Sequence, residues 1–185
     1  MNAGRHLFLT GYRAVGKTTV AEILADRLDR PWIDLDQWIV QRRGETIAET
    51  FARGGERAFR DIESAALRTV VAEPEGVVSL GGGTILCADN RRLIRDSGPV
   101  VWLTAAAETI ASRIEQDAAS IANRPALTDQ GLLAEVTELL SHRDPLYREV
   151  ADLVVSTETM TPVEIADEIV RWWGRKGGGG STAMC

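Results

Sequence analysis

The segment Gly11–Thr18, which reads GYRAVGKT, constrains the fold of this chain more than any other feature. It matches the pattern GxxxxGK[ST], a glycine-rich loop whose backbone N–H groups surround phosphate oxygens. The apolar stretch His6–Thr10 before it is typical of a strand, and apolar residues recur at helical spacing from Val20 to Leu28. This order of strand, loop and helix favours a phosphate-binding loop over a glycine-rich turn with an incidental lysine.

The polar groups of this loop have expected roles in holding a nucleotide. Lys17 reaches the β- and γ-phosphates, the helix N-terminus adds partial positive charge, and the Thr18 hydroxyl is a ligand for Mg²⁺. GTPases, ATPase motors, nucleotide kinases and small-molecule kinases share such a loop, so the acceptor site must decide among them. The expected ATP-binding residues here are Ala14, Val15, Gly16, Lys17, Thr18 and Thr19.

Short apolar segments bounded by glycine or proline recur along the chain, as in buried parallel strands. Helix-compatible stretches separate them, which predicts an open, mostly parallel α/β sheet with helices on both faces. Ligands of such sheets bind at the carboxyl ends of the strands. The five predicted strands are residues 6–10, 32–35, 77–80, 100–103 and 153–155.

Two of the helical stretches carry boundary signals of their own. A long helical pattern covers about residues 47–71, and Gly54–Gly55 is expected to interrupt it. The segment Thr161–Glu164 reads TPVE, a capping box with proline at the first helical position. The last helix is therefore expected to run to about Trp173.

Length and composition indicate one domain, which we place at residues 1–176, because 185 residues with 44% hydrophobic side chains can bury a sizeable core. The polar segment 117–131 is expected to form a mobile lid, and residues 177–185 a disordered tail.

The net charge of −6 argues against nucleic acid as a partner. No apolar run reaches the roughly 18 residues that span a bilayer. Two cysteines suggest no disulfide framework, which fits a reducing cytoplasm. We also expect a monomer.

Two aspartates lie at the end of the second predicted strand, in the sequence Asp34-Leu35-Asp36. If the strand continues through Leu35, both carboxylates lie on one side of it. In a kinase, one carboxylate can take the proton of the acceptor hydroxyl while the other holds Mg²⁺, directly or through water. We expect Asp36 to be the base. The alternative, a strand-ending turn with solvated aspartates, is disfavoured by the phosphate loop.

A glycine triplet and three arginines complete the expected acceptor site. Gly81–Gly83 lets backbone amides come close to a ligand, although a sharp turn would use the same residues. Arg60 and Arg143 suit a carboxylate, which a guanidinium grips through two parallel hydrogen bonds, although a solvated helix face is the default for either. Arg124, unless it is an ordinary loop arginine, is expected to close over the phosphates with the lid.

In their order along residues 6–173, these motifs resemble the shikimate kinase family. The resemblance implies a three-layer α/β/α P-loop kinase fold, like that of nucleoside-monophosphate kinases, with a central five-stranded parallel sheet and a mobile lid. It implies transfer of the ATP γ-phosphoryl group to the 3-hydroxyl of shikimate in aromatic amino-acid biosynthesis. The matching motifs are the phosphate loop, Asp34-Leu35-Asp36, Phe59-Arg60 with Glu63, Ser79–Gly83, Asn123-Arg124-Pro125 and Arg143 before Pro145–Arg148.

The resemblance also implies a role for each matching residue. Thr18 would bind Mg²⁺ and Asp34 would hold it through water. Lys17 and Arg124 would neutralise charge during an in-line transfer, and Arg124 would be the lid arginine on ATP. The residues expected to bind shikimate are Asp36, Arg60, Gly82 and Arg143, and those expected to be catalytic are Asp36, Lys17 and Arg124.

Some positions depart from the common family pattern. Tyr12 and Val15 are bulky where small residues are frequent, and Val155–Thr157 reads VST where Val-Asp-Thr is more usual near adenine. Residues 115–122 lack the arginine that many relatives place against adenine. Two alternatives remain open. One is a gluconate or other small-metabolite kinase, which the glycine triplet and the arginine pair disfavour. The other is a catalytically idle nucleotide-binding module, which would need none of Asp36, Arg60 and Arg143.

Overall fold

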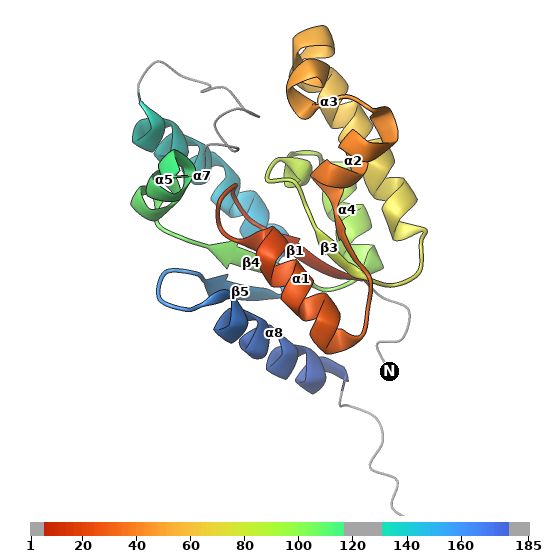
Figure 1. Ribbon diagram of the computed structural model, residues 1–185, viewed down its shortest axis with the longest axis vertical. Helices are drawn as coiled ribbons and strands as arrows, with labels where there is room; N and C mark the ends of the chain where they lie inside the picture. Colours follow the sequence, from red (N-terminus) through yellow and green to blue (C-terminus); the bar gives the residue numbers. More distant parts are fainter. Residues whose placement is uncertain (1–5, 117–130, 178–185) are drawn as a thin grey trace, which may run out of the picture.

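The computed structural model describes residues 6–116 and 131–177, and its centre is a five-stranded parallel sheet (Figure 1). The strand order is β2-β3-β1-β4-β5, so the strand that leads into the phosphate loop is the middle one. Leu9 of this strand lies opposite Ser79 on one side and Val101 on the other. All five predicted strands are confirmed: β1 (Leu7–Thr10), β2 (Trp32–Asp34), β3 (Val77–Ser79), β4 (Val100–Thr104) and β5 (Leu153–Ser156).

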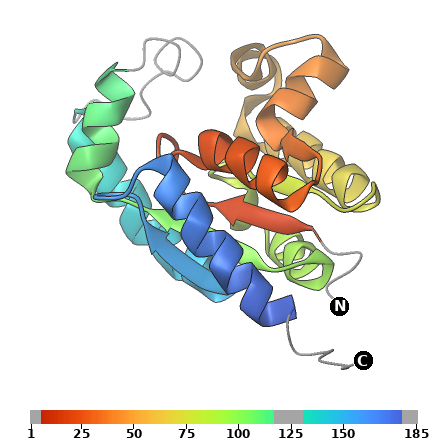
Figure 2. The same ribbon diagram turned by 60° about the horizontal axis from the view of Figure 1, so that its bottom comes forward.

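Helices connect successive strands and cover both faces of the sheet. Helices α1 and α8 lie side by side on one face, as Figure 2 shows from a second direction. Helices α3 and α4 and the end of α7 pack on the other face. The helical elements are α1 (Lys17–Leu28), α2 (Leu35–Arg43), α3 (Ile47–Val71), the 3-10 turn η1 (Thr84–Leu86), α4 (Ala88–Ser97), α5 (Ala107–Gln116), α7 (Leu132–Val150) and α8 (Pro162–Gly177).

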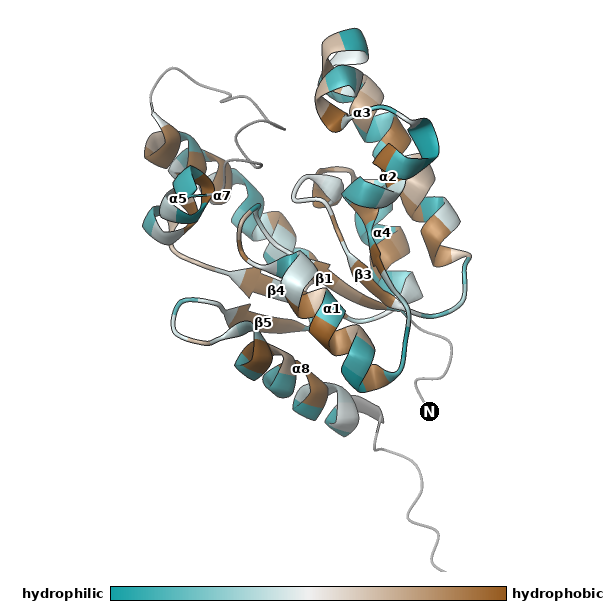
Figure 3. Ribbon diagram, in the orientation of Figure 1, coloured by the Kyte–Doolittle hydropathy of each residue, from teal (hydrophilic) through white to brown (hydrophobic). Residues whose placement is uncertain are grey.

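The hydrophobic core is divided between the two faces because successive side chains of a strand point to opposite sides. In β1, Leu9 packs with α1 and α8, whereas Phe8 packs with α3 and α4. In β4, Leu103 joins the first cluster and Trp102 the second. With both faces covered, the strands consist mostly of apolar residues, which appear brown in Figure 3.

The predicted continuation of the second strand through Leu35 is wrong. β2 ends at Asp34, which is the N-cap of α2, a helix that the sequence analysis does not predict. The Asp34 side chain accepts a hydrogen bond from the backbone N–H of Gln37 at 3.1 Å. A carboxylate in this position satisfies a helical N–H group that has no partner within the helix. Asp36 therefore lies in the first turn of a helix rather than on a strand.

The boundary signals of the two other helices are confirmed, with one correction. Inside α3, Gly55 has φ 71° and ψ −176°, which breaks the helical geometry as predicted. At the start of α8, the Thr161 N–H donates to Glu164 at 2.7 Å and the Glu164 N–H donates to the Thr161 hydroxyl at 3.3 Å. This is the predicted capping box. However, α8 continues past Trp173 to Gly177, so Gly177 belongs to the helix rather than to a tail.

Two predicted segments lie outside the described residues: the lid at 117–131, except for Gly131, and the tail after Gly177. Among the described helices, none combines the length and the apolar composition needed to cross a membrane.

Candidate active site

The phosphate loop turns between β1 and α1 through backbone conformations that favour glycine. Gly11 has φ +138°, and a Cβ atom there would lie 2.3 Å from the carbonyl oxygen of Leu103. Gly16, just before α1, has φ +89°. The Lys17 ammonium group folds back over the loop, donating to the carbonyl oxygens of Gly11 at 3.0 Å and Tyr12 at 2.8 Å. This places a cation where a phosphate-binding loop needs one.

The first turn of α1 and the end of β2 bring two oxygen donors together. The Thr18 hydroxyl donates a hydrogen bond to the Asp34 carboxylate at 2.7 Å. Hydroxyl and carboxylate oxygens are hard ligands of the kind that Mg²⁺ prefers. This ion usually takes one or two protein ligands together with water and substrate phosphates. Thr18 and Asp34 therefore fit a magnesium ion bound with a nucleotide.

Asp36 lies beside the glycine triplet, close to a buried carboxylate. A Cβ atom at Gly81 would lie 2.8 Å from Asp36 Oδ1 and 2.7 Å from Glu63 Oε1. Glu63 accepts hydrogen bonds at 2.7 Å from the Thr84 hydroxyl and from Arg60 Nη1. Burial raises the pKa of Glu63, and Arg60 and Thr84 offset part of that effect. Asp36 and Arg60 thus lie in the same corner of the site.

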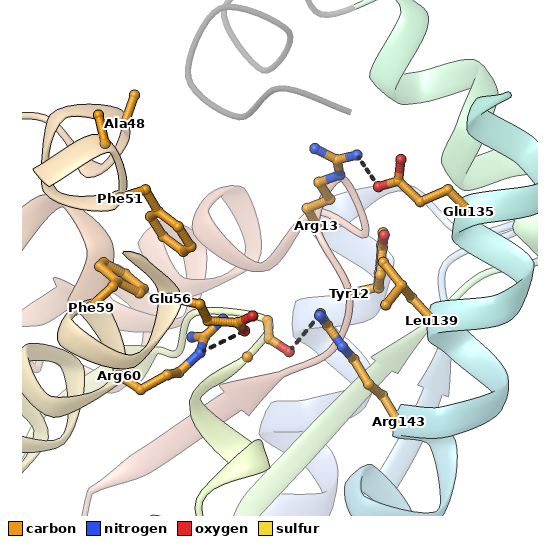
Figure 4. A pocket seen from close by; sticks show the side chains of 13 residues that line it. Tyr12, Arg13, Ala48, Phe51, Glu56, Phe59, Arg60, Glu135, Leu139 and Arg143 are labelled. Atoms are coloured by element: carbon orange, nitrogen blue, oxygen red, sulfur yellow. Dashed lines mark hydrogen bonds and ion pairs between the residues drawn. The ribbon is translucent and has the colours of Figure 1, made fainter. Parts of the chain in front are cut away.

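A cavity of about 370 Å³ lies between the phosphate loop, α3 and α7 (Figure 4). Arg60 from α3 and Arg143 from α7 enter it from opposite sides. Arg143 donates to the carbonyl oxygen of Gly82 at 3.4 Å, and its guanidinium lies 5.6 Å from the centre of the Tyr12 ring. The volume suits a small metabolite, and two facing guanidinium groups suit an anionic one.

The charge of Arg60 is reinforced by its neighbours. Burial by itself would lower the pKa of Arg60, but the carboxylates of Glu63 and Glu56 outweigh burial and raise it. A Cβ atom at Gly83 would lie 2.4 Å from the guanidinium, so the side chain needs a glycine there to lie against the backbone. The structure thus holds a permanent cation at one wall of the cavity.

The residues that connect the glycine triplet with the rest of the site belong to no local pattern that predicts these contacts. The Tyr147 hydroxyl donates to the carbonyl oxygen of Gly82 at 2.6 Å, and its buried ring stacks on Trp102. Burial raises the pKa of Tyr147, which keeps the hydroxyl a donor. In the phosphate loop, Arg13 forms an ion pair with buried Glu135 of α7 at 3.4 Å. No spacing rule in the sequence joins these pairs, because each links distant segments.

Arg113 is a second connection that sequence analysis does not identify. It lies in α5, just before residues 115–122, where an arginine near adenine is missing. Its guanidinium donates to the carbonyl oxygen of Ala14 at 3.4 Å and to the hydroxyl and carbonyl oxygens of Thr157 at 2.9 and 2.8 Å. A cation therefore bridges the phosphate loop and the segment after β5.

The remaining predicted residues have three different outcomes. Val15 is buried in the hydrophobic core, so only its backbone remains to contact a ligand. Thr19 is exposed on α1, and its contact with a nucleotide stays a prediction. Arg124 lies outside the described residues, so its position over the phosphates also stays a prediction.

Comparison with known proteins agrees with this geometry. A family model described as "Shikimate kinase" matches residues 13–173. The chain is 46% identical over 167 residues to the shikimate kinase of Rhodopirellula baltica, which covers 90% of this chain and 89% of that protein. It is 42% identical over 163 residues to shikimate kinase 2 of Escherichia fergusonii, which covers 88% of each. The solved structure of a shikimate kinase from Acinetobacter baumannii in complex with shikimate has a TM-score of 0.87 at 32% identity, covering 95% of this chain and 96% of that one.

Proposed function

The chain belongs to the shikimate kinase family, and from this premise we propose that it transfers the γ-phosphoryl group of ATP to the 3-hydroxyl of shikimate. The products are shikimate 3-phosphate and ADP, and the reaction serves aromatic amino-acid biosynthesis. One observation carries the proposal. Arg60 and Arg143 face each other across a cavity that borders both the phosphate loop and the corner that holds Asp36. Such a cavity offers places for a carboxylate, a hydroxyl and a phosphoryl donor together.

The two arginines hold the carboxylate of the acceptor. Guanidinium groups bind carboxylates through charge-assisted hydrogen bonds, and two groups on opposite walls also fix the orientation of the ring. Gly82 lies between the phosphate loop and Tyr147, where its backbone contacts the acceptor. Gluconate also carries a carboxylate, so the two arginines by themselves do not separate the two acceptors. The match of the shikimate kinase family model over residues 13–173 favours shikimate.

Asp36 orients or deprotonates the 3-hydroxyl, and the phosphate loop holds the donor. Lys17 neutralises charge on the β- and γ-phosphates as the phosphoryl group moves in line to the acceptor oxygen. Arg124 is proposed to add a second cation from the lid and to exclude water. Thr18 and, through water, Asp34 would hold Mg²⁺, which when bound neutralises phosphate charge.

Arg113 and Thr157 form the adenine side of the nucleotide site. Support comes from their hydrogen bonds to each other and from the bond between Arg113 and the carbonyl oxygen of Ala14. A planar guanidinium at the edge of the phosphate loop offers a surface on which a purine ring stacks. Many relatives have an arginine against adenine within the segment that corresponds to residues 115–122. In this chain Arg113, which precedes that segment, takes its place.

We also propose that the protein acts as a monomer in the cytoplasm. The described lining of the cavity comes from one chain, and α3 and α7 supply both arginines without a second copy. Analytical ultracentrifugation at working concentration tests the monomer, and a dimer that dissociates with loss of activity would contradict it.

A coupled ADP-release assay with different acceptors tests the reaction. We expect ADP release that depends on shikimate, little release with gluconate, and only background release without an acceptor. Quinate, which carries a similar carboxylate, measures the strictness of the site. Equal release with and without shikimate would refute the proposed function. Strong turnover of gluconate would favour the alternative metabolite kinase.

A further inference from the structure

The guanidinium of Arg60 is shared by two carboxylates that contact different parts of it. Glu63 accepts from Nη1 at 2.7 Å. Glu56 accepts with a single oxygen from both Nε and Nη2, at 3.3 Å each (Figure 4). The edge formed by Nε and Nη2 is one of those that bind a carboxylate through two parallel hydrogen bonds. Glu56 therefore occupies a carboxylate position on Arg60.

The two carboxylates differ in how firmly they are held. The Glu63 side chain is 1% exposed and is also hydrogen-bonded to Thr84 at 2.7 Å. The Glu56 side chain is 61% exposed, and both of its hydrogen bonds to Arg60 are long. Exposed pairs at i and i+4 contribute little to stability, so Glu56 can turn into water at low cost. Glu63 is a fixed neighbour of Arg60, whereas Glu56 is replaceable.

Both Glu56 and Arg60 line the cavity, so the replaceable carboxylate lies where the acceptor binds. Gly55 breaks α3 directly before Glu56, which makes Glu56 the first residue of the second helical half. Among the described residues, no carboxylate forms an ion pair with Arg143 across the cavity. Of the two arginines proposed to bind the acceptor, Arg60 is thus the one whose carboxylate-binding edge, Nε and Nη2, already contacts a carboxylate of the protein itself, that of Glu56.

We infer that Glu56 sets the affinity of the site for its acceptor: it occupies the acceptor-carboxylate position on Arg60, and the carboxylate of the acceptor displaces it. This rests on the proposed function, in which Arg60 binds that carboxylate. An acceptor with a carboxylate replaces the contact that Glu56 gives up. A neutral acceptor offers no replacement and leaves Glu56 in place, so its binding does not depend on Glu56.

The test compares the full-length protein with Glu56→Gln by calorimetric titration with shikimate and by KM. Glutamine has the same shape but no charge, so it competes less well for Arg60. We expect the dissociation constant and the KM for shikimate to fall about two- to fivefold, the range of an exposed ion pair. The KM for the methyl ester of shikimate, which has no charge to bind Arg60, should stay within error.

Two further variants make the result decisive. Glu56→Ala removes both the charge and the acceptor oxygen and should lower the KM for shikimate at least as much as Glu56→Gln. Asp89→Asn removes an exposed ion pair with Arg92 on α4, away from the cavity, and should leave both KM values unchanged. Thermal unfolding of each variant checks that the fold is retained.

The opposite results would overturn the inference. A higher or unchanged KM for shikimate in Glu56→Gln would mean that Glu56 supports Arg60 or has no role. An equal fall for the acid and the ester would mean that the effect is steric. Shikimate-dependent ADP release by the unaltered protein is judged separately, because it tests the proposed reaction. The displacement of Glu56 is tested by the ratio of two dissociation constants for shikimate, that of the unaltered protein and that of Glu56→Gln.

Discussion

Asp34 and Asp36 are only two residues apart, yet the structure places them in different surroundings. Asp34 caps α2 and accepts a hydrogen bond from Thr18 at the nucleotide side. Asp36, in the first turn of the helix, lies beside Gly81 and Glu63, at the side proposed to bind the acceptor. The turn from strand to helix at Leu35 therefore separates the two proposed roles, metal support and hydroxyl activation.

This separation predicts a selective loss in Asp36→Asn. The amide keeps the shape of the side chain but cannot take a proton, so turnover should fall about 100-fold or more, the usual contribution of a general base. ATP affinity should stay within error because Asp36 is proposed to contact the acceptor and not the nucleotide. Coupled ADP release and ATP titration measure the two quantities. Weaker ATP binding with normal turnover would contradict the assigned role.

At the scale of single elements, capping boxes define where α3 and α8 begin. In α3 the Thr46 N–H donates to Glu49 at 2.7 Å, and in α8 the Thr161 N–H donates to Glu164 at the same distance. Hydrogen bonds from the backbone and hydroxyl of Thr161 lower the pKa of Glu164 from its ordinary 4.5. The carboxylate form of this side chain therefore favours the folded helix.

The lowered pKa predicts how the stability of Glu164→Ala depends on pH. A group whose pKa is lowered by folding adds stability above its unfolded pKa and loses it as the pH falls through the folded pKa. The variant should melt below the unaltered protein at about pH 7, and the difference should shrink towards about pH 3. Thermal unfolding followed by circular dichroism measures both. Glu164→Gln keeps an acceptor oxygen, so its melting temperature at about pH 7 should fall less than that of Glu164→Ala. A difference in melting temperature between Glu164→Ala and the unaltered protein that does not change with pH would contradict the role of the charge.

At the scale of the whole molecule, one sheet joins two hydrophobic clusters. Phe8 and Leu9 are adjacent and fully buried, but they belong to clusters on opposite faces. The groups of the candidate active site come from loops and helices that extend from the same sheet. Loss of packing on either face should therefore weaken the whole structure rather than one part of it.

Phe8→Ala and Leu9→Ala test this shared stability. We expect losses of about 3–5 and 2–5 kcal/mol respectively in the free energy of unfolding, from lost burial and residual cavities. Urea unfolding should show one transition for each variant, with the same midpoint by tryptophan fluorescence and circular dichroism. Separate midpoints would contradict the prediction of a single cooperative domain.

Local patterns were sufficient to predict a large part of the fold. The phosphate loop, the five strands and the capping box of α8 each depend on residues close together in the chain, and all five strands form the predicted parallel sheet. The helix α2 is not predicted, because the second strand is expected to continue through Leu35, whereas it ends at Asp34, which is also the N-cap of α2. An aspartate at the end of a strand is compatible with either continuation until its neighbours are placed.

The sequence by itself determined that the chain has a phosphate-binding loop in an α/β sheet, with candidate acceptor residues at strand ends. Only the tertiary structure decided how these residues meet: Tyr147 on Gly82, Arg113 between Ala14 and Thr157, and the phosphate loop on α7 through Arg13. Such contacts depend on distances between segments far apart in the chain. Hydrogen bonds and ion pairs need a few ångströms between atoms, which no spacing of residues specifies until the sheet has brought the segments together.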